Sequence, residues 1–150
     1  MNTVVVLDTG VLGMVVHPKK QGEPLECKQW LEDVLTRGFL VYVPEVADYE
    51  LRRELMRLNA TTQLARLDAL KTRIGYAAIT TTAMIKAAEF WAAARQAGAP
   101  TADPKELDCD AILAAQTTLI PTAGQHAIIA TTNVGHLSLF GDARSWRDVP

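Results

Sequence analysis

Near its start the chain carries the stretch Val4-Val5-Val6-Leu7, which ends at Asp8. A continuous β-branched run of this kind is typical of a strand buried on both faces, as in a parallel sheet. Strands of that type need helices on both sides of the sheet, so the stretch favours an α/β fold and a ligand site where the strand ends.

Strand and helix patterns alternate along the rest of the chain. Further strands are predicted at 39–43, 76–80 and 126–131, with a short fifth strand at 146–149. Apolar residues at helical spacing predict helices at 23–36, 45–58, 61–72, 83–97 and 108–119, and the residues from 99 to 106 read as a polar loop. This alternation predicts one α/β domain over residues 1–150 with a mostly parallel sheet.

Composition narrows the classes of function. The chain has 150 residues, with 15 Lys plus Arg and 17 Asp plus Glu, for a net charge of −2. This balance argues against a protein that coats nucleic acid through a large net positive charge, but it allows an enzyme that binds a few phosphates locally. Two cysteines are too few for a disulfide framework and suit a reducing cytosol.

Signals for export or membrane insertion are missing from the sequence. The first apolar run stops at Asp8 with no basic region before it, unlike a signal peptide. No stretch approaches the roughly 18 consecutive apolar residues of a membrane span. We therefore expect a cytoplasmic protein with no membrane partner.

Oxygen-bearing side chains follow the predicted strands at points where ligands bind. Asp8 follows the first strand, Asn133 follows the fourth, and Asp110 lies early in the helix that precedes the fourth. Glu50 lies one to two turns into the helix after the second strand. Because ligands in open parallel sheets bind beyond the carboxyl ends of the strands, these residues are expected to meet at one edge. One or two such carboxylates suffice for Mg²⁺, which keeps several waters.

Each acid also has a simpler structural explanation. Asp8 suits a turn or helix cap, Glu50 a solvated helix face, and Asp108 a cap with favourable dipole interactions. Asp108 and Asp110 are two residues apart and point to different sides of a regular helix, so they converge only if Asp108 lies at or before the cap.

Other catalytic chemistries lack their sequence signals. His17, His126 and His136 lie in separate segments without metal-ligand spacing. Neither Ser138 nor Ser145 sits in a nucleophile elbow, and no glycine-rich phosphate loop is present. The acids therefore carry the strongest chemical signal.

Four segments, taken in order, resemble the PIN-domain family of metal-dependent ribonucleases, which includes VapC-type toxins. They are Val4-Val5-Val6-Leu7-Asp8-Thr9-Gly10, Val43-Pro44-Glu45-Val46-Ala47-Asp48-Tyr49-Glu50-Leu51, Asp110-Ala111-Ile112-Leu113-Ala114-Ala115 and Ile129-Ala130-Thr131-Thr132-Asn133-Val134-Gly135-His136. The resemblance spans essentially the whole chain. It implies a single PIN-like domain, folded as a three-layer α/β/α sandwich with about five parallel strands.

The resemblance also implies hydrolysis of RNA phosphodiester bonds with Mg²⁺ or Mn²⁺. Its catalytic acids fall on Asp8, Glu50 and Asp110, which would hold the ions. Many members have Asp where this chain has Asn133, and the neutral amide leaves open whether one or two ions bind. Asp108 is a further candidate ligand. Candidates for contact with the substrate are Thr9, Arg53 and Thr131, and Thr131 or Thr9 could instead orient a water or a carboxylate.

Partners follow from the same resemblance. It implies an RNA substrate, a homodimer and, for a toxin of a type II toxin–antitoxin pair, a small antitoxin protein. Residues 50–73 carry six basic and three acidic side chains, a local surplus of +3 that could guide an RNA backbone.

Two other functions compete with a ribonuclease. One is a catalytically weak or inactive scaffold or RNA-binding module, which the substitution at Asn133 leaves open. The other is a phosphatase of the haloacid dehalogenase type, which needs a second acid two residues after Asp8, where this chain has Gly10.

Overall fold

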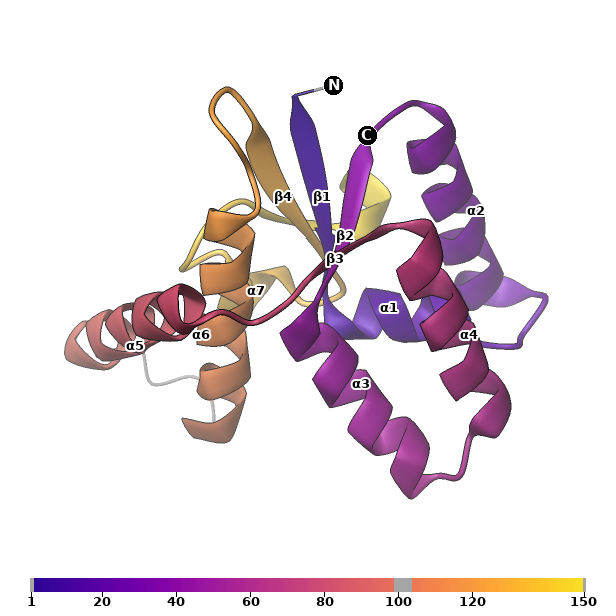
Figure 1. Cartoon of the computed structure of the whole chain (residues 1–150), viewed down its shortest axis with the longest axis horizontal. Helices are drawn as coiled ribbons and strands as arrows, with labels where there is room; N and C mark the ends of the chain where they lie inside the picture. The colour runs from indigo at the N-terminus through magenta and orange to yellow at the C-terminus, as the bar shows by residue number, and fades with distance from the viewer. Residues whose placement is uncertain (1, 99–103, 150) are drawn as a thin grey trace.

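The computed structural model describes residues 2–98 and 104–149, apart from the side chains of residues 104–106 and 136. Its strands form one sheet with helices on both faces (Figure 1). The strands are β1 (Thr3–Leu7), β2 (Leu40–Pro44), β3 (Gly75–Ala77), β4 (His126–Thr131) and β5 (Ala143–Ser145). The helices are α1 (Thr9–Val16), α2 (Gly22–Thr36), α3 (Glu45–Arg57), α4 (Thr61–Arg73), α5 (Thr81–Gln96), α6 (Pro104–Leu119) and α7 (Val134–Leu137), followed by the 3₁₀ helix η1 (Trp146–Asp148).

The sheet has the strand order β3-β2-β1-β4-β5, and every neighbouring pair is parallel. Strand β1 lies at its centre, where Val5 pairs with Val41 of β2 and Ile128 of β4. The predicted sheet of about five mostly parallel strands is confirmed. Because β2 and β4 flank β1 on opposite sides, the order of strands reverses beside β1.

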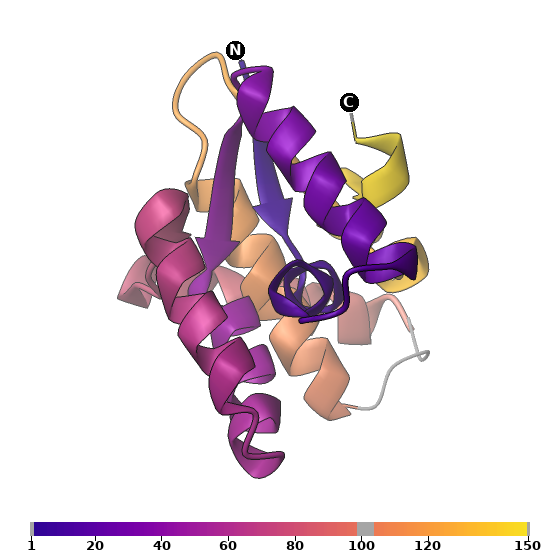
Figure 2. The same cartoon turned by 90° about the vertical axis from the view of Figure 1, so that its right-hand side faces the viewer.

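Alternate residues of β1 face opposite layers of helices. Val5 and Leu7 pack in a core that is covered by α1, α2 and α4, whereas Val4 and Val6 pack toward α6 and α7. Helix α5 lies outside α6 and forms the left flank in Figure 1. The molecule is therefore a three-layer α/β/α sandwich, as expected, and Figure 2 shows it from the side of α2 and α4.

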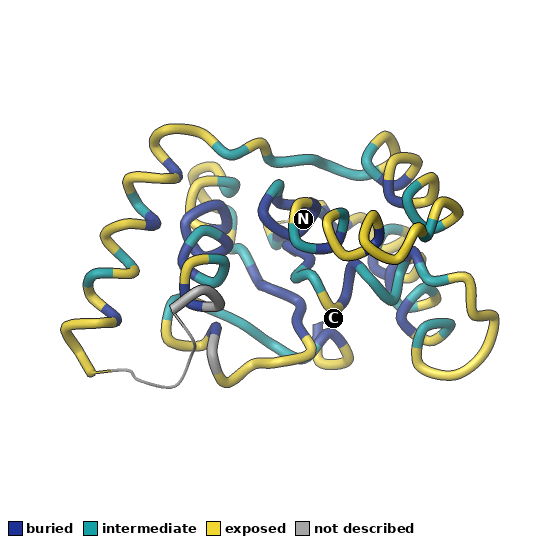
Figure 3. The backbone as a smooth tube through the Cα atoms, turned by 90° about the horizontal axis from the view of Figure 1, so that it is seen from below, coloured by how far each residue is buried: buried dark blue, intermediate teal, exposed yellow. Residues whose placement is uncertain are grey.

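Burial follows this layering. Val4, Val5, Val6 and Leu7 are all fully buried, and Figure 3 shows the buried residues along the strands and on the inner faces of the helices. Each such side chain contributes roughly 1.5–3 kcal/mol when it leaves water. In the part of the chain that the structure describes, no helix combines the length and the apolar character needed to cross a bilayer.

Helix α1 was not predicted from the sequence. It begins directly after β1, with Asp8 as its N-cap, and the Asp8 carboxylate accepts a hydrogen bond from the Thr9 backbone N–H at 2.7 Å. The helix contains two glycines and three valines, which lower intrinsic helix propensity and hide the period. Tertiary burial of Val11 and Leu12 outweighs that propensity.

The short edge strands also differ from the prediction. Strand β3 covers Gly75–Ala77 instead of 76–80, and the strand expected at 146–149 is wrong, because β5 ends at Ser145 and η1 follows. The polar loop is wrong for 104–106, which belong to α6, while 99–103 lie outside the described residues. Three-residue strands are too short to show a period.

Candidate functional site

A cavity of about 230 Å³ opens where the strand order reverses. It lies at the carboxyl ends of β1 and β4, the position at which open α/β sheets bind ligands. Seven of the residues that the structure describes line it, namely Asp8, Thr9, Gly10, Glu50, Asp110, Asn133 and Leu137. The structure therefore brings together the three predicted catalytic acids, along with Asn133 and Thr9.

Asp8 is held in place from two directions. One oxygen accepts the Thr9 N–H at 2.7 Å, and the other accepts the hydroxyl of Thr131, also at 2.7 Å. The same Thr131 oxygen accepts the backbone N–H of Asn133 at 2.9 Å. Because Thr131 is fully buried at the end of β4, its hydroxyl fixes the Asp8 carboxylate and the turn that carries Asn133.

Glu50 reaches the cavity from the second turn of α3. The Thr9 hydroxyl donates a hydrogen bond to Glu50 Oε1 at 2.9 Å, so α1 and α3 are linked at the cavity wall. The Cys109 thiol lies beside the same carboxylate. Burial, followed by the charge of Glu50 and a hydrogen bond with it, raises the pKa of Cys109 to about 11. Cys109 was not predicted from the sequence, because a single cysteine on a helix carries no spacing signal.

The two acids of α6 diverge. Asp110 is half-buried and lines the cavity, whereas Asp108 is exposed and lines a separate hollow between α5 and α6 with Met84 and Trp91. Helix α6 begins at Pro104, so Asp108 lies within the helix and not at its cap. The condition for its convergence with Asp110 is therefore not met.

The donor set of the cavity is made of oxygen atoms. Three carboxylates, the Asn133 amide and the Thr9 hydroxyl suit a hard cation such as Mg²⁺ or Mn²⁺. Among the described residues, however, no group of three or more His, Cys, Asp or Glu side chains could hold a metal ion by itself. The fit is thus to an ion with one or two direct carboxylates that fills its other positions with water.

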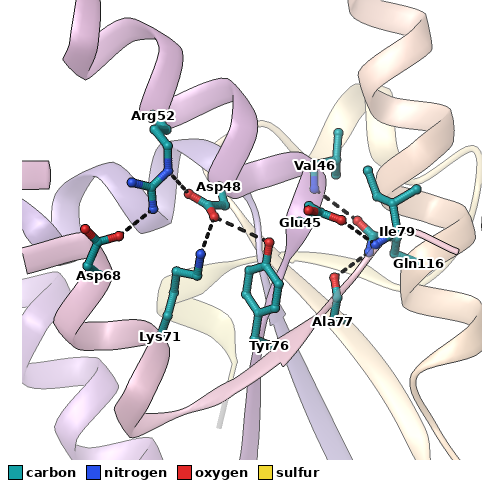
Figure 4. A network of polar contacts seen from close by, with 10 residues as sticks. All are labelled: Glu45, Val46, Asp48, Arg52, Asp68, Lys71, Tyr76, Ala77, Ile79 and Gln116. Atoms are coloured by element: carbon teal, nitrogen blue, oxygen red, sulfur yellow. Dashed lines mark hydrogen bonds and ion pairs between the residues drawn. The ribbon is translucent and has the colours of Figure 1, made fainter.

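Helix α3 is anchored by the buried carboxylate of Asp48, which does not line the cavity (Figure 4). Asp48 accepts Arg52 Nε at 2.9 Å, Lys71 Nζ at 2.8 Å and the Tyr76 hydroxyl at 3.5 Å. Burial, with the charges of Glu45 and Asp48, raises the pKa of Tyr76. This network ties α4 and β3 to α3, the helix that carries Glu50.

A second link in Figure 4 joins α3 to α6. The buried side chain of Gln116 accepts the Val46 N–H at 3.1 Å and donates to the Ala77 carbonyl at 2.7 Å. The helices that carry Glu50 and Asp110 are therefore connected through a hydrogen bond at the N-terminus of α3.

Most of the basic surplus between residues 50 and 73 is neutralised by ion pairs. Arg52 and Lys71 pair with Asp48, Arg57 with Glu54, and Arg73 with Glu32. Arg66 donates to the His17 carbonyl. Arg53 is different, since its guanidinium lies over the Tyr49 ring, 5.0 Å from the centroid.

Comparisons with known proteins relate the fold to solved complexes. No family model matches the chain, and no curated protein does. VapBC2 from Rickettsia felis bound to a DNA fragment from its promoter matches with a TM-score of 0.70 and 13% identity, over 95% of this chain and 98% of that chain. DNA-bound VapBC from Salmonella typhimurium matches with a TM-score of 0.70 and 16% identity, over 96% and 98%. FitAcB from Neisseria gonorrhoeae matches with a TM-score of 0.65 and 17% identity, over 97% and 99%.

These findings correct the family expected from the sequence. The chain is not placed in the PIN-domain family of VapC-type ribonucleases, because no family model matches it. The solved neighbours are chains of VapBC and FitAcB complexes, and at 13–17% identity they show a shared fold alone. Short segments that end in an acid after a strand recur in many α/β folds, so their order does not distinguish one family from another.

Proposed function

We propose that this protein is a metal-dependent endoribonuclease that hydrolyses RNA phosphodiester bonds and acts within a toxin–antitoxin pair. One observation carries the proposal. Three carboxylates from β1–α1, α3 and α6 line a single cavity at the switch point of the sheet. Carboxylates gathered in this way suit divalent-cation hydrolysis of a phosphodiester, and they disfavour direct binding of an anion by the protein alone.

Each polar residue that lines the cavity would have its own role in this reaction. Asp8, with both oxygens oriented by hydrogen bonds, is the best-fixed ligand for a divalent ion, and Glu50 and Asp110 would hold it directly or through waters. Such an ion supplies an acidified water nucleophile and neutralises charge on the phosphate. Thr9 fixes Glu50, which can then accept a hydrogen bond from a water molecule. Asn133 offers a neutral carbonyl oxygen to the same cavity.

The toxin–antitoxin context rests on the solved neighbours. Those neighbours include VapBC proteins bound to DNA. We infer a small protein partner for this chain and a homodimeric assembly, with RNA as the substrate. Co-expression with the product of an adjacent short reading frame, followed by co-purification, tests the partner.

Cleavage of single-stranded RNA in the presence of Mg²⁺ or Mn²⁺ tests the activity. Changing Asp8 to Asn keeps a helix-capping residue, so the fold should survive. Cleavage should fall by more than about 100-fold, since altering even an outer-sphere partner of a metal typically costs 10–100-fold. Asp108→Asn is the matched control, because Asp108 lines a different hollow and its loss should leave cleavage unchanged.

The same assay separates the enzyme from an RNA-binding module without activity. The absence of a tight three-residue metal cluster among the described residues favours that second function. Wild-type protein that binds RNA but never cleaves it with either ion would establish the module. Full metal-dependent cleavage by Asp8→Asn would show that the site is assigned to the wrong residues.

A further inference from the structure

Tyr49 exposes an aromatic ring to solvent beside the candidate site. It is 57% exposed, which is the largest exposed fraction among the aromatic side chains of the described residues. It directly precedes Glu50, which lines the cavity. Leaving a ring in water forgoes the free energy of its burial, so an exposed ring next to a reactive site is a candidate for contact with a ligand.

Arg53 holds this ring from one turn further along α3. Its guanidinium carbon lies 5.0 Å from the centroid of the Tyr49 ring, within the range of a cation–π contact. A hydrogen bond with Tyr49 raises the pKa of Arg53, and the nearby Cys109 and Glu50 contribute in the same direction. Tyr49 and Arg53 thus form one pair on α3 that adjoins the cavity wall.

The charge of Arg53 is available to a ligand. Arg52 pairs with Asp48 and Asp68, and Arg57 pairs with Glu54. Within the described part of the chain, Arg53 makes no ion pair with a carboxylate, and it is exposed. Among the described residues, those that line the cavity include three carboxylates and no cation, so a nucleic-acid backbone would find positive charge beside the cavity at Arg53.

From this geometry we propose that Tyr49 and Arg53 form a platform for single-stranded RNA, with a base next to the scissile phosphate stacked on the Tyr49 ring. This inference rests on the proposed function and identifies the form of its substrate. A ring stacks on any unpaired base, whereas bases within a duplex are already stacked on each other. Arg53 would contact the backbone phosphate beside that base.

Binding of a fluorescein-labelled single-stranded RNA oligonucleotide, measured by anisotropy on the full chain with EDTA present, tests the platform without cleavage. Tyr49→Ala should weaken binding about five- to 150-fold, the range for one stacked base. Tyr49→Phe should bind within about twofold of wild type, since it keeps the stacking face. Arg53→Gln should weaken binding and reduce the slope of log affinity against log salt by about 0.7, the value for one phosphate contact on a single strand.

Met56→Ala is the matched control. Met56 lies on the same helix and is 56% exposed, but it has no aromatic ring. The variant therefore tests whether loss of any exposed apolar side chain from α3 weakens RNA binding. Loss of Met56 should leave RNA binding unchanged. A duplex of the same sequence should compete weakly with the labelled single strand.

Four results would overturn the platform. They are an absence of single-strand binding, an unchanged affinity for Tyr49→Ala, equal losses for Tyr49→Phe and Tyr49→Ala, and equal losses for Met56→Ala and Tyr49→Ala. A change in oligomeric mass with unchanged RNA affinity would assign the ring to a protein interface instead. Tyr49-dependent binding without any cleavage would leave the platform standing while the proposed function fails. Metal-dependent cleavage by the wild type, with Tyr49→Ala binding and cleaving RNA as well as wild type, would support the proposed function and overturn the platform.

Discussion

At the scale of single residues, the Thr131 hydroxyl does more than its place in the sequence suggests. It donates to Asp8 across 123 positions of the chain and accepts the Asn133 N–H, so one buried oxygen joins the ends of β1 and β4. From the sequence, Thr131 was a candidate to contact the substrate or to orient a water or a carboxylate. The structure shows it bonded to a carboxylate.

Thr131→Val should separate this orienting role from the fold. Valine has nearly the same shape, but it removes the donor to Asp8 and leaves the Asn133 N–H without its acceptor. We expect a loss of about 1–3 kcal/mol in the free energy of unfolding. Metal-dependent cleavage should fall about 10–100-fold, as for other residues that orient a metal ligand. Thr131→Ser, which keeps the hydroxyl, should restore most of both, and no recovery in that variant would contradict the orienting role.

At the scale of elements, helix α3 shows why a site is harder to predict than a fold. Two acids of this helix have different roles. Asp48 is buried in an ion-pair network, whereas Glu50 lines the cavity. The apolar spacing of Val46, Leu51 and Leu55 predicts the helix. It cannot show that Asp48 is buried, because the partner Lys71 comes from another helix.

Elements with a clear apolar pattern were easier to predict than elements held mainly by tertiary contacts. The run from Val4 to Leu7 predicts β1 and the parallel sheet, because full burial on both faces requires apolar residues at every position. Helix α1 was missed, since its stability comes from packing and from the Asp8 cap. Strand β3 begins at Gly75, where a Cβ atom would lie 2.6 Å from carbons of the Tyr42 ring, and such a cross-strand fit is invisible before the register is known.

Removing the charge of Asp48 tests how α3 is held. Asp48→Asn leaves Arg52 and Lys71, each about a quarter exposed, without their shared carboxylate. Breaking a fully buried pair costs about 3–5 kcal/mol, and the partial exposure here reduces the expected loss to roughly 2 kcal/mol. That corresponds to a fall in Tm of about 4–8 °C for a chain of this length.

Asp68→Asn is the control for Asp48→Asn. Asp68 also pairs with Arg52, but its side chain is 63% exposed. Its loss should change stability by less than about 1 kcal/mol. Equal shifts in Tm for the two variants, measured by thermal melts under one condition, would show that burial of Asp48 does not anchor the helix.

At the scale of the whole molecule, the net charge of −2 is a sum of unlike regions. The excess positive charge of residues 50–73 is largely neutralised within the fold, because Arg52, Lys71 and Arg73 form ion pairs with carboxylates. Three further carboxylates share one cavity. Under the proposed function, RNA would therefore meet positive charge mainly near Arg53, and a cation would bind inside the cavity. The sequence had instead predicted that the surplus of +3 over residues 50–73 could guide the RNA backbone.

Binding of a divalent cation should accordingly stabilise the whole chain. Like charges that share a cavity repel one another, and a cation that binds only the folded protein stabilises it by about 2.7 kcal/mol at 100 times its Kd. For 150 residues we expect Mn²⁺ or Mg²⁺ to raise Tm by about 5–10 °C relative to EDTA. Asp8→Asn should lose most of this shift, whereas Asp108→Asn should keep it, because only Asp8 lines the cavity. Equal shifts in both variants would place the cation elsewhere on the surface, and no shift in wild type at millimolar ion would remove the metal from the proposed mechanism.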